Sequence, residues 1–171
     1  GYDPEINFVE DNTIIDGEFQ DEKYFGHRLK EINEWFGVEF LGMPDDLCIL
    51  GFRGGEFTGI PELFLPQEYW TSAMEEIRKL RPDVKFMAVT DDPDTARAYL
   101  PPEVKVTHDI AMDWRMIRHA NYLIISNSSF YIFPALLNNH AKKIIAPRYW
   151  ARRNTGVWAL PQNYYKKFTY I

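Results

Sequence analysis

The segment Tyr122–Leu137 constrains the fold of this chain more than any other. Its first four residues are apolar, as in a strand that is buried on both faces of a sheet. Polar residues at 126–129 interrupt the apolar run, and a second apolar segment of helical length follows. A strand that leads through hydroxyl and amide groups into a helix start suits phosphate binding, because free backbone N–H groups face an incoming anion there. Helix capping by the same residues is the alternative interpretation.

A second buried-strand pattern, Leu47–Leu50, ends in a glycine-rich turn that carries Arg53. Glycines allow the backbone to approach a ligand closely, and the planar guanidinium suits a diphosphate. An arginine this close to a buried strand needs an anionic partner. Either a ligand phosphate or a local carboxylate such as Glu56 is therefore expected to bind it.

Strands and helices alternate along the chain from residue 46 onward. Strands are expected at 47–52, 85–90, 104–106, 122–125 and 143–146, and helices at 66–80, 93–99, 110–119 and after Ser128. Asp109 is expected to cap the helix at 110–119. This alternation predicts a parallel sheet with helices on both faces. Ligands bind at the carboxyl ends of such strands, where both polar turns are expected to lie.

Residues 1–45 follow a different pattern. A strand over Asn12–Phe19 and a helix over Leu29–Phe36 are expected, and the glycines that follow indicate a linker. We therefore predict an N-terminal segment with a linker over 1–45 and the α/β domain with a C-terminal tail over 46–171. The tail is expected to cover the domain or to line a cleft with its basic and aromatic residues, Arg148, Trp150, Arg152, Arg153 and Trp158.

Composition excludes several classes of protein. Hydrophobic residues make up 46% of the 171, which indicates a folded chain, and the net charge of −6 argues against a general nucleic-acid binder. The single cysteine, Cys48, excludes a disulfide within the chain. No apolar run approaches the roughly 18 residues of a transmembrane helix. We expect a cytoplasmic or peripherally membrane-associated protein.

Six ordered segments resemble glycosyltransferase family 11, whose members are α-1,2-fucosyltransferases that use GDP-fucose. The segments are Gly17–Phe25, Gly51–Phe57, Leu65–Trp70, Val89–Asp92, Ile124–Phe130 and Lys143–Trp150. The resemblance covers nearly the whole chain. It implies a Rossmann-like, nucleotide-sugar-binding domain, the donor-binding half of a GT-B-type enzyme. The implied reaction is inverting transfer of a sugar, fucose in the family, from a GDP-sugar donor to a hydroxyl of a glycan acceptor.

The chain departs from the family pattern at several positions. The family has His-Val-Arg-Arg-Gly-Asp-Tyr at 51–57, so that Gly51, Gly54 and Glu56 replace the His, the second Arg and the Asp. Arg53 stands at the first Arg, which contacts the donor diphosphate in the wider fucosyltransferase group. Tyr131-Ile-Phe-Pro134 stands where the family has Ser-Trp-Trp-Gly. The acceptor-side motif Gly-Gly-Leu-Gly-Asn-Gln does not occur in the 171 residues, which implies an N-terminal acceptor-side domain as a partner.

Arg53 and Glu56 are predicted to act in catalysis. Arg53 would stabilise the charge that grows on the leaving diphosphate, and Glu56 would act as a general base on the acceptor hydroxyl. The other bases considered are His108 and His119. Donor binding is predicted, partly through the resemblance, for Arg53, Asp91, Asp92, Ser126, Asn127, Ser128, Ser129 and Phe130.

Metal and cofactor are not expected at this site. Asp92-Pro93-Asp94 is the nearest approach to a metal-binding Asp-x-Asp motif, and its proline indicates a helix start instead. Helix capping is also the alternative for Asp91 and Asp92 themselves. Two further functions stay open beside the transferase: a degenerate, non-catalytic nucleotide-sugar or glycan-binding domain, and a structural or interaction domain suggested by the aromatic tail.

Overall fold

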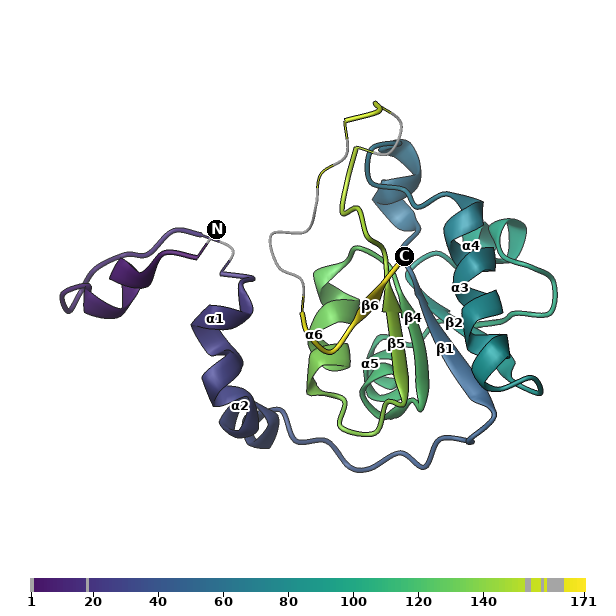
Figure 1. Ribbon diagram of the computed structural model, residues 1–171, viewed down its shortest axis with the longest axis horizontal. Helices are drawn as coiled ribbons and strands as arrows, with labels where there is room; N and C mark the ends of the chain where they lie inside the picture. Colours follow the sequence, from purple (N-terminus) through teal and green to yellow (C-terminus); the bar gives the residue numbers. More distant parts are fainter. Residues whose placement is uncertain (1, 18, 153–154, 158, 160–164) are drawn as a thin grey trace.

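A computed structural model of the chain describes residues 2–17, 19–152, 155–157, 159 and 165–171. At its centre lies a parallel sheet with the strand order β3-β2-β1-β4-β5-β6 (Figure 1). The strands are β1 (Leu47–Phe52), β2 (Lys85–Thr90), β3 (Lys105–Thr107), β4 (Tyr122–Ile125), β5 (Lys143–Ala146) and β6 (Thr169–Tyr170). The chain adds strands outward on one side of β1 and then continues on the other side with β4. This order is the one found in Rossmann-like folds.

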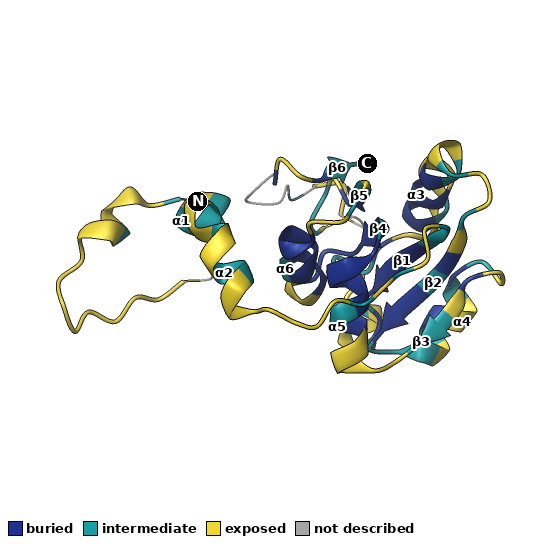
Figure 2. Cartoon of the chain, turned by 90° about the horizontal axis from the view of Figure 1, so that it is seen from below, coloured by how far each residue is buried: buried dark blue, intermediate teal, exposed yellow. Residues whose placement is uncertain are grey.

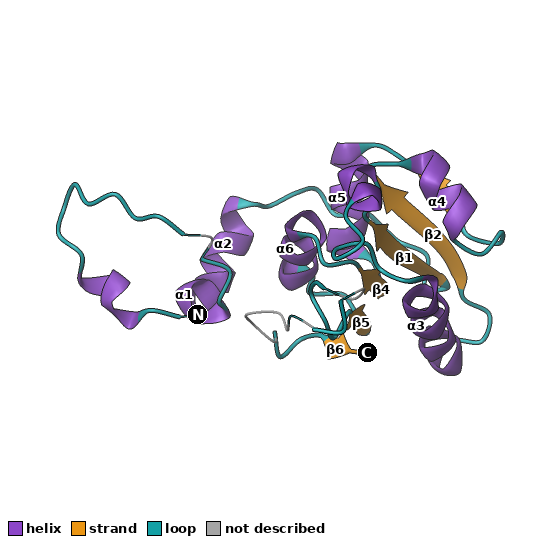
Figure 3. Ribbon diagram, turned by 90° about the horizontal axis from the view of Figure 1, so that it is seen from above, coloured by secondary structure: helices purple, strands orange, loops and turns teal. Residues whose placement is uncertain are grey.

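Four helices connect the strands and cover both faces of the sheet (Figure 3). They are α3 (Gln67–Leu80), α4 (Pro93–Tyr99), α5 (Ile110–His119) and α6 (Ser129–Leu137). Alternate residues of β1 pack to opposite sides: Leu50 lies in the core under α3 and α4, and Ile49 lies in the core under α5 and α6. The sheet is therefore buried between two apolar layers, which explains why its central strands are apolar at every position.

Most of the predicted elements are confirmed. The strands at 47–52, 85–90, 122–125 and 143–146 and the helices at 93–99 and 110–119 have the expected bounds, and Asp109 caps α5. Pro66 is the N-cap of α3 rather than its first residue, and β3 begins one residue later than expected. β6 was not expected, because two residues are too short for a periodic pattern to show.

The strand predicted over Asn12–Phe19 is wrong for the residues that are described there, 12–17 and 19. A strand needs a neighbour that takes up its backbone hydrogen bonds, and this segment pairs with none of the described strands. Ile14 is 95% exposed, so its apolar character does not correspond to a core position. Figure 2 shows this part of the chain as an exposed arm.

The N-terminal segment contacts α5, α6 and the C-terminal tail of the α/β body. It contains short helical turns at Pro4–Phe8 and Gly26–Arg28 and the helices α1 (Glu22–Phe25) and α2 (Leu29–Trp35). Phe36, directly after α2, packs edge-on against Phe133 of α6, and the Tyr165 hydroxyl donates to the Gln20 carbonyl oxygen at 2.6 Å. The helix predicted at 29–36 is confirmed, and it ends one residue earlier, at Trp35.

The C-terminal tail covers part of the body, as expected. Trp150 packs against the core under α5 and α6, where Tyr165 and Phe168 are buried. Arg153 and Trp158 lie outside the described residues. Among the residues described, no helix combines the length and the apolar character that a membrane span requires.

Candidate functional site

The two polar turns found in the sequence meet where the strand order changes direction. β1 and β4 are neighbours, and the backbone N–H of Ser126 donates to the carbonyl oxygen of Gly51 at 3.0 Å. Arg53 and Ser126 therefore follow adjacent strand ends at the carboxyl edge of the sheet. In open α/β sheets this switch point is the usual place for a ligand.

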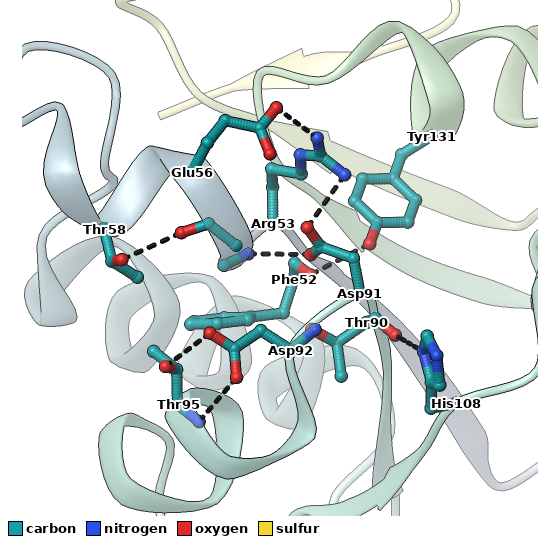
Figure 4. A network of polar contacts seen from close by, with 12 residues as sticks. Phe52, Arg53, Glu56, Thr58, Thr90, Asp91, Asp92, Thr95, His108 and Tyr131 are labelled. Atoms are coloured by element: carbon teal, nitrogen blue, oxygen red, sulfur yellow. Dashed lines mark hydrogen bonds and ion pairs between the residues drawn. The ribbon is translucent and has the colours of Figure 1, made fainter.

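Arg53 forms two ion pairs with carboxylates of neighbouring segments (Figure 4). Its Nη2 lies 2.5 Å from Oε1 of Glu56, and its Nη1 lies 2.8 Å from Oδ2 of Asp91. The other oxygen of Asp91 accepts from the backbone N–H of Gly54 at 2.9 Å, which joins the end of β2 to the turn after β1. Pairing with local carboxylates, the alternative interpretation of the sequence, is therefore the arrangement observed.

A cavity of about 270 Å³ opens at this edge of the sheet. The alternation of side chains along β1 and β2 places Arg53 and Asp91 on the face covered by α5 and α6. The cavity is lined by Arg53, Thr90, Asp91, His108, Ile110, Asp113, Phe130 and Tyr131. The structure thus brings Arg53 and Phe130 together, whereas Ser126 to Ser129 do not line this cavity.

Asp113 is a site residue that the sequence interpretation missed. The residue is 3% exposed, its Oδ2 accepts from the backbone N–H of Asp109 at 3.2 Å, and its Oδ1 is buried without a partner among the residues described. Burial raises the pKa of the Asp113 carboxyl to about 6. The sequence did contain a signal for this residue. Asp113 falls in the same helical row as the apolar residues Met116, Ile117 and Ala120, and a charged residue at such a core-facing position is rare.

His108 also lines the cavity, with a defined tautomer. Its Nδ1 lies 2.5 Å from the carbonyl oxygen of Thr90. A carbonyl oxygen only accepts, so Nδ1 carries the proton and Nε2 is left as an acceptor in the neutral ring. His119 instead ends α5, at the opposite edge of the sheet, where its Nδ1 bonds the carbonyl oxygen of Arg115. Of the two histidines considered as bases, only His108 lies at the site.

The polar loop after β4 is mostly buried. Asn127 donates to the carbonyl oxygens of Leu63 (3.0 Å) and Trp150 (2.6 Å) and so ties three segments together. Ser126 Oγ and Asn127 Oδ1 are buried without hydrogen-bond partners among the described residues. Ser128 occupies the N-cap position of α6, but its side chain makes no capping hydrogen bond, and Ser129 is exposed. Capping by a hydroxyl therefore does not explain this serine-rich loop.

Asp92 and Glu56 are both engaged locally. The two carboxylate oxygens of Asp92 accept from the backbone N–H (3.1 Å) and the hydroxyl (2.6 Å) of Thr95, which caps α4 and lowers the pKa of Asp92. Hydrogen bonding by its own backbone N–H, and then by Arg53, lowers the pKa of Glu56, whose side chain is 63% exposed. A lowered pKa makes Glu56 a weaker base than an ordinary glutamate.

Two glycines of the segment 51–57 have a steric reason. A Cβ at Gly51 would lie 2.7 Å from Cγ of Tyr131, so the ring occupies the space that a side chain at residue 51 would need. The Tyr131 hydroxyl donates to the carbonyl oxygen of Phe52 at 2.9 Å, and burial raises its pKa. A Cβ at Gly54 would lie 2.6 Å from Cβ of Asp92, which leaves no room there for a second arginine.

In the part of the chain that is described, no three His, Cys, Asp or Glu side chains gather in a way that could hold a metal ion. Comparisons of the sequence with family models and with curated proteins found no match, and a comparison with solved structures found none either.

Proposed function

We propose that this chain is the donor-binding part of a glycosyltransferase and that a GDP-sugar binds at the carboxyl edge of the sheet, in the cavity at the ends of β1 and β2 beside α5 and α6. The observation that carries the proposal is that Arg53 and the buried Asp113 line one cavity at the carboxyl edge of the sheet. A nucleotide sugar needs a cation for its diphosphate and polar partners for its base. These two side chains provide both within a cavity of about 270 Å³.

Asp113 favours guanine among the common bases. Guanine presents two adjacent N–H donors, and a carboxylate accepts such a pair through its two oxygens. Uracil presents one N–H between two acceptors, and the corresponding edge of adenine has one donor beside an acceptor. Because Oδ1 of Asp113 is buried without a partner among the described residues, a donor from the base would satisfy it. Phe130, 37% exposed at the mouth of the cavity, offers a ring face for stacking.

Arg53 supports the transfer step in this proposal. As the bond between the sugar and the diphosphate breaks, negative charge grows on the diphosphate, and a guanidinium stabilises that charge. Glu56, bonded to Arg53 at 2.5 Å, is 63% exposed and can turn toward solvent when a diphosphate takes its place. His108 lies in the same cavity, and its Nε2 is an acceptor when Nδ1 carries the proton, so it is the second candidate for the base. The acceptor-side half of a GT-B enzyme would position the glycan.

Calorimetry with GDP, ADP and UDP tests the proposal. GDP is expected to bind most tightly, and Asp113→Asn is expected to weaken GDP binding by about tenfold or more, since an amide presents a donor where guanine also presents one. Asp94→Asn makes the same chemical change at an exposed residue and serves as the control. Equal affinities for the three nucleotides, or an unchanged affinity for GDP in Asp113→Asn, would contradict the assignment.

A non-catalytic nucleotide-sugar-binding domain is the second candidate. The observation that favours it is the double ion pair of Arg53 with Glu56 and Asp91. The two carboxylates already neutralise the positive charge of Arg53, which a leaving diphosphate would need for its stabilisation. Hydrolysis of GDP-fucose in the presence of the proposed acceptor-side domain separates the two candidates. We expect the 171-residue chain to bind nucleotide but to transfer little sugar, because one wall of a cleft provides only part of the roughly 7–11 kcal/mol available from positioning the reactants. Robust transfer to a defined glycan by this chain would overturn that expectation.

A further inference from the structure

Arg118 is a buried cation to which none of the described residues presents a carboxylate. It lies in the last turn of α5, at the amino edge of the sheet and thus opposite Arg53, and it is 7% exposed. Its Nη2 donates to Oδ1 of Asn33 in α2, and its Nε is buried without a partner in the described part of the chain. Burial lowers the pKa of this guanidinium, and no neighbouring carboxylate opposes the effect. A buried charge is normally paired, so Arg118 departs from the usual arrangement within the described part of the chain.

A cavity of about 300 Å³ lies between α2 and the end of α6. Asn33, which is bonded to Arg118, is one of its lining residues. Its polar lining consists of Lys30, Asn33, Asn139 and Lys167. Three leucines, Leu29, Leu136 and Leu137, form the apolar remainder of the lining. No lining residue is acidic, and the chain after Asp113 contains nine Lys and Arg residues and no Asp or Glu.

The polar groups of this cavity are arranged as donors. Asn33 uses its amide oxygen to accept from Arg118, so its N–H₂ group is what remains for the cavity. Lys167 donates to the carbonyl oxygens of Leu136 (2.8 Å) and Asn138, which offsets the partial negative charge at the end of α6. One N–H of its ammonium is then left. Neither Lys30 nor Lys167 forms an ion pair with the described residues.

We propose that this cavity binds a small organic anion, with its carboxylate or phosphate group on Lys30, Lys167 and Asn33 and a short apolar body against the leucines. Arg118 acts as a positioning residue: it holds the amide of Asn33 in the donating orientation and adds positive charge behind it. The volume of the cavity suits a small molecule rather than a macromolecular segment. Because the site lies at the opposite edge from Arg53, it does not depend on the proposed nucleotide site.

Titrations with three probes test this site: hexanoate, acetate and inorganic phosphate, followed by thermal unfolding and by NMR of the leucine methyl groups and side-chain amides. Hexanoate should bind more tightly than acetate if the leucines take up its chain, and phosphate will show whether a phosphate head is preferred. Lys30→Gln and Lys167→Gln should each weaken the binding of the best probe by about tenfold, as expected when a charged hydrogen bond is lost. Lys166→Gln, which removes the same charge outside the cavity, should leave the affinity unchanged.

Asn33→Asp provides a second test, because it builds the missing carboxylate into the protein. The new carboxylate should pair with Arg118, raise the melting temperature in the absence of added anion and abolish the response to all three probes. Asn139→Asp is the matched control: it should also abolish binding, because it places a negative charge in the cavity, but without the rise in melting temperature. Loss of stability in Asn33→Asp would overturn the role of Arg118. Equal probe affinities in Lys30→Gln, Lys167→Gln and Lys166→Gln would overturn the site.

Discussion

The two edges of the sheet hold arginines in opposite electrostatic situations. At the carboxyl edge, Arg53 is a quarter exposed and is bonded to two carboxylates, Glu56 and Asp91. At the amino edge, Arg118 is 7% exposed and is bonded to the neutral amide of Asn33. The more accessible charge is thus over-compensated, and the more buried charge has no described anionic partner. In the two proposals, the first site releases a carboxylate when it accepts an anion, whereas the second accepts an anion without releasing one.

The difference has consequences for affinity and for selectivity. In the proposed complex a diphosphate at Arg53 would replace Glu56, while Asp91 is held by the backbone N–H of Gly54. Binding there is weakened by the carboxylate that remains, so it should depend on further contacts such as those of Asp113 with the base. At the proposed amino-edge site no described carboxylate competes with the ligand, so a simple anion is expected to bind. We expect the carboxyl edge to be selective and the amino edge to be permissive.

The largest expected effect is the loss of GDP affinity in Arg53→Ala. Removal of a charge-assisted, bidentate contact should weaken donor binding by about 2–4 kcal/mol, because Asp91 and Glu56 then face the diphosphate uncompensated. Arg53→Lys should restore little, since an ammonium cannot reproduce the planar fork. Calorimetry with GDP provides the measurement. If wild type and both variants bind GDP equally, the carboxyl edge is not the nucleotide site.

The next effect concerns the buried carboxyl at the carboxyl edge. The pKa of Asp113 is raised from 3.8 to about 6, so the folded state holds this proton more tightly than the unfolded state between these values. Its contribution to stability therefore falls as the pH rises from about 4 to 6 and stays unfavourable above 6. Asp113→Asn should raise the free energy of unfolding at pH 7.5 by about 1–3 kcal/mol and much less at pH 4.5.

Urea denaturation of Asp113→Asn at the two pH values measures this difference, with Asp94→Asn as an exposed control. An identical gain at both pH values would show that ionisation of Asp113 is not its cause.

The next smaller effect is the change in the free energy of unfolding when the charge of either arginine is removed. Arg53→Gln leaves two carboxylates close together and should lower the free energy of unfolding by about 1–2 kcal/mol. Arg118→Met removes a buried charge without a carboxylate partner and should raise the free energy of unfolding by up to about 1 kcal/mol when no anion is added. Opposite signs in chemical denaturation at neutral pH support the contrast between the edges. A destabilised Arg118→Met would mean that its charge is compensated in solution.

The smallest effect separates true caps from the serine loop at the carboxyl edge. Asp109 accepts from the backbone N–H of Met112 at 3.0 Å, so Asp109→Ala should cost about 1 kcal/mol of stability. Ser128 makes no such bond, and Ser128→Ala should cost less than about 0.5 kcal/mol. Thermal unfolding of both variants, with GDP titrations in parallel, checks this. A loss at Ser128→Ala as large as that at Asp109→Ala would assign the hydroxyl to capping.

The fold of the body was accessible from the sequence because its signals are local. Leu47–Phe52 and Tyr122–Ile125 are apolar throughout, Asp109 precedes a helical row, and turns separate the elements. Hydrophobic burial and backbone hydrogen bonding act within such short windows, so the elements and their parallel arrangement follow from the pattern. β6 did not follow from the sequence, because its pairing with a distant strand leaves no trace in two residues. The exposed arm at residues 12–17 did not follow either, because six residues do not reveal whether a partner strand is present.

The candidate site, like the fold, was predictable from the sequence only in part. The sequence by itself determined that Arg53 and the polar loop after β4 lie at strand ends, because strand boundaries and parallel order place them there. Only the tertiary structure decided which partners they meet. The two carboxylates on Arg53, the burial of Asp113 and the isolation of Arg118 all arise from contacts between segments distant in the chain. Electrostatic environment depends on distance and burial in three dimensions, which a linear pattern of residue types does not contain.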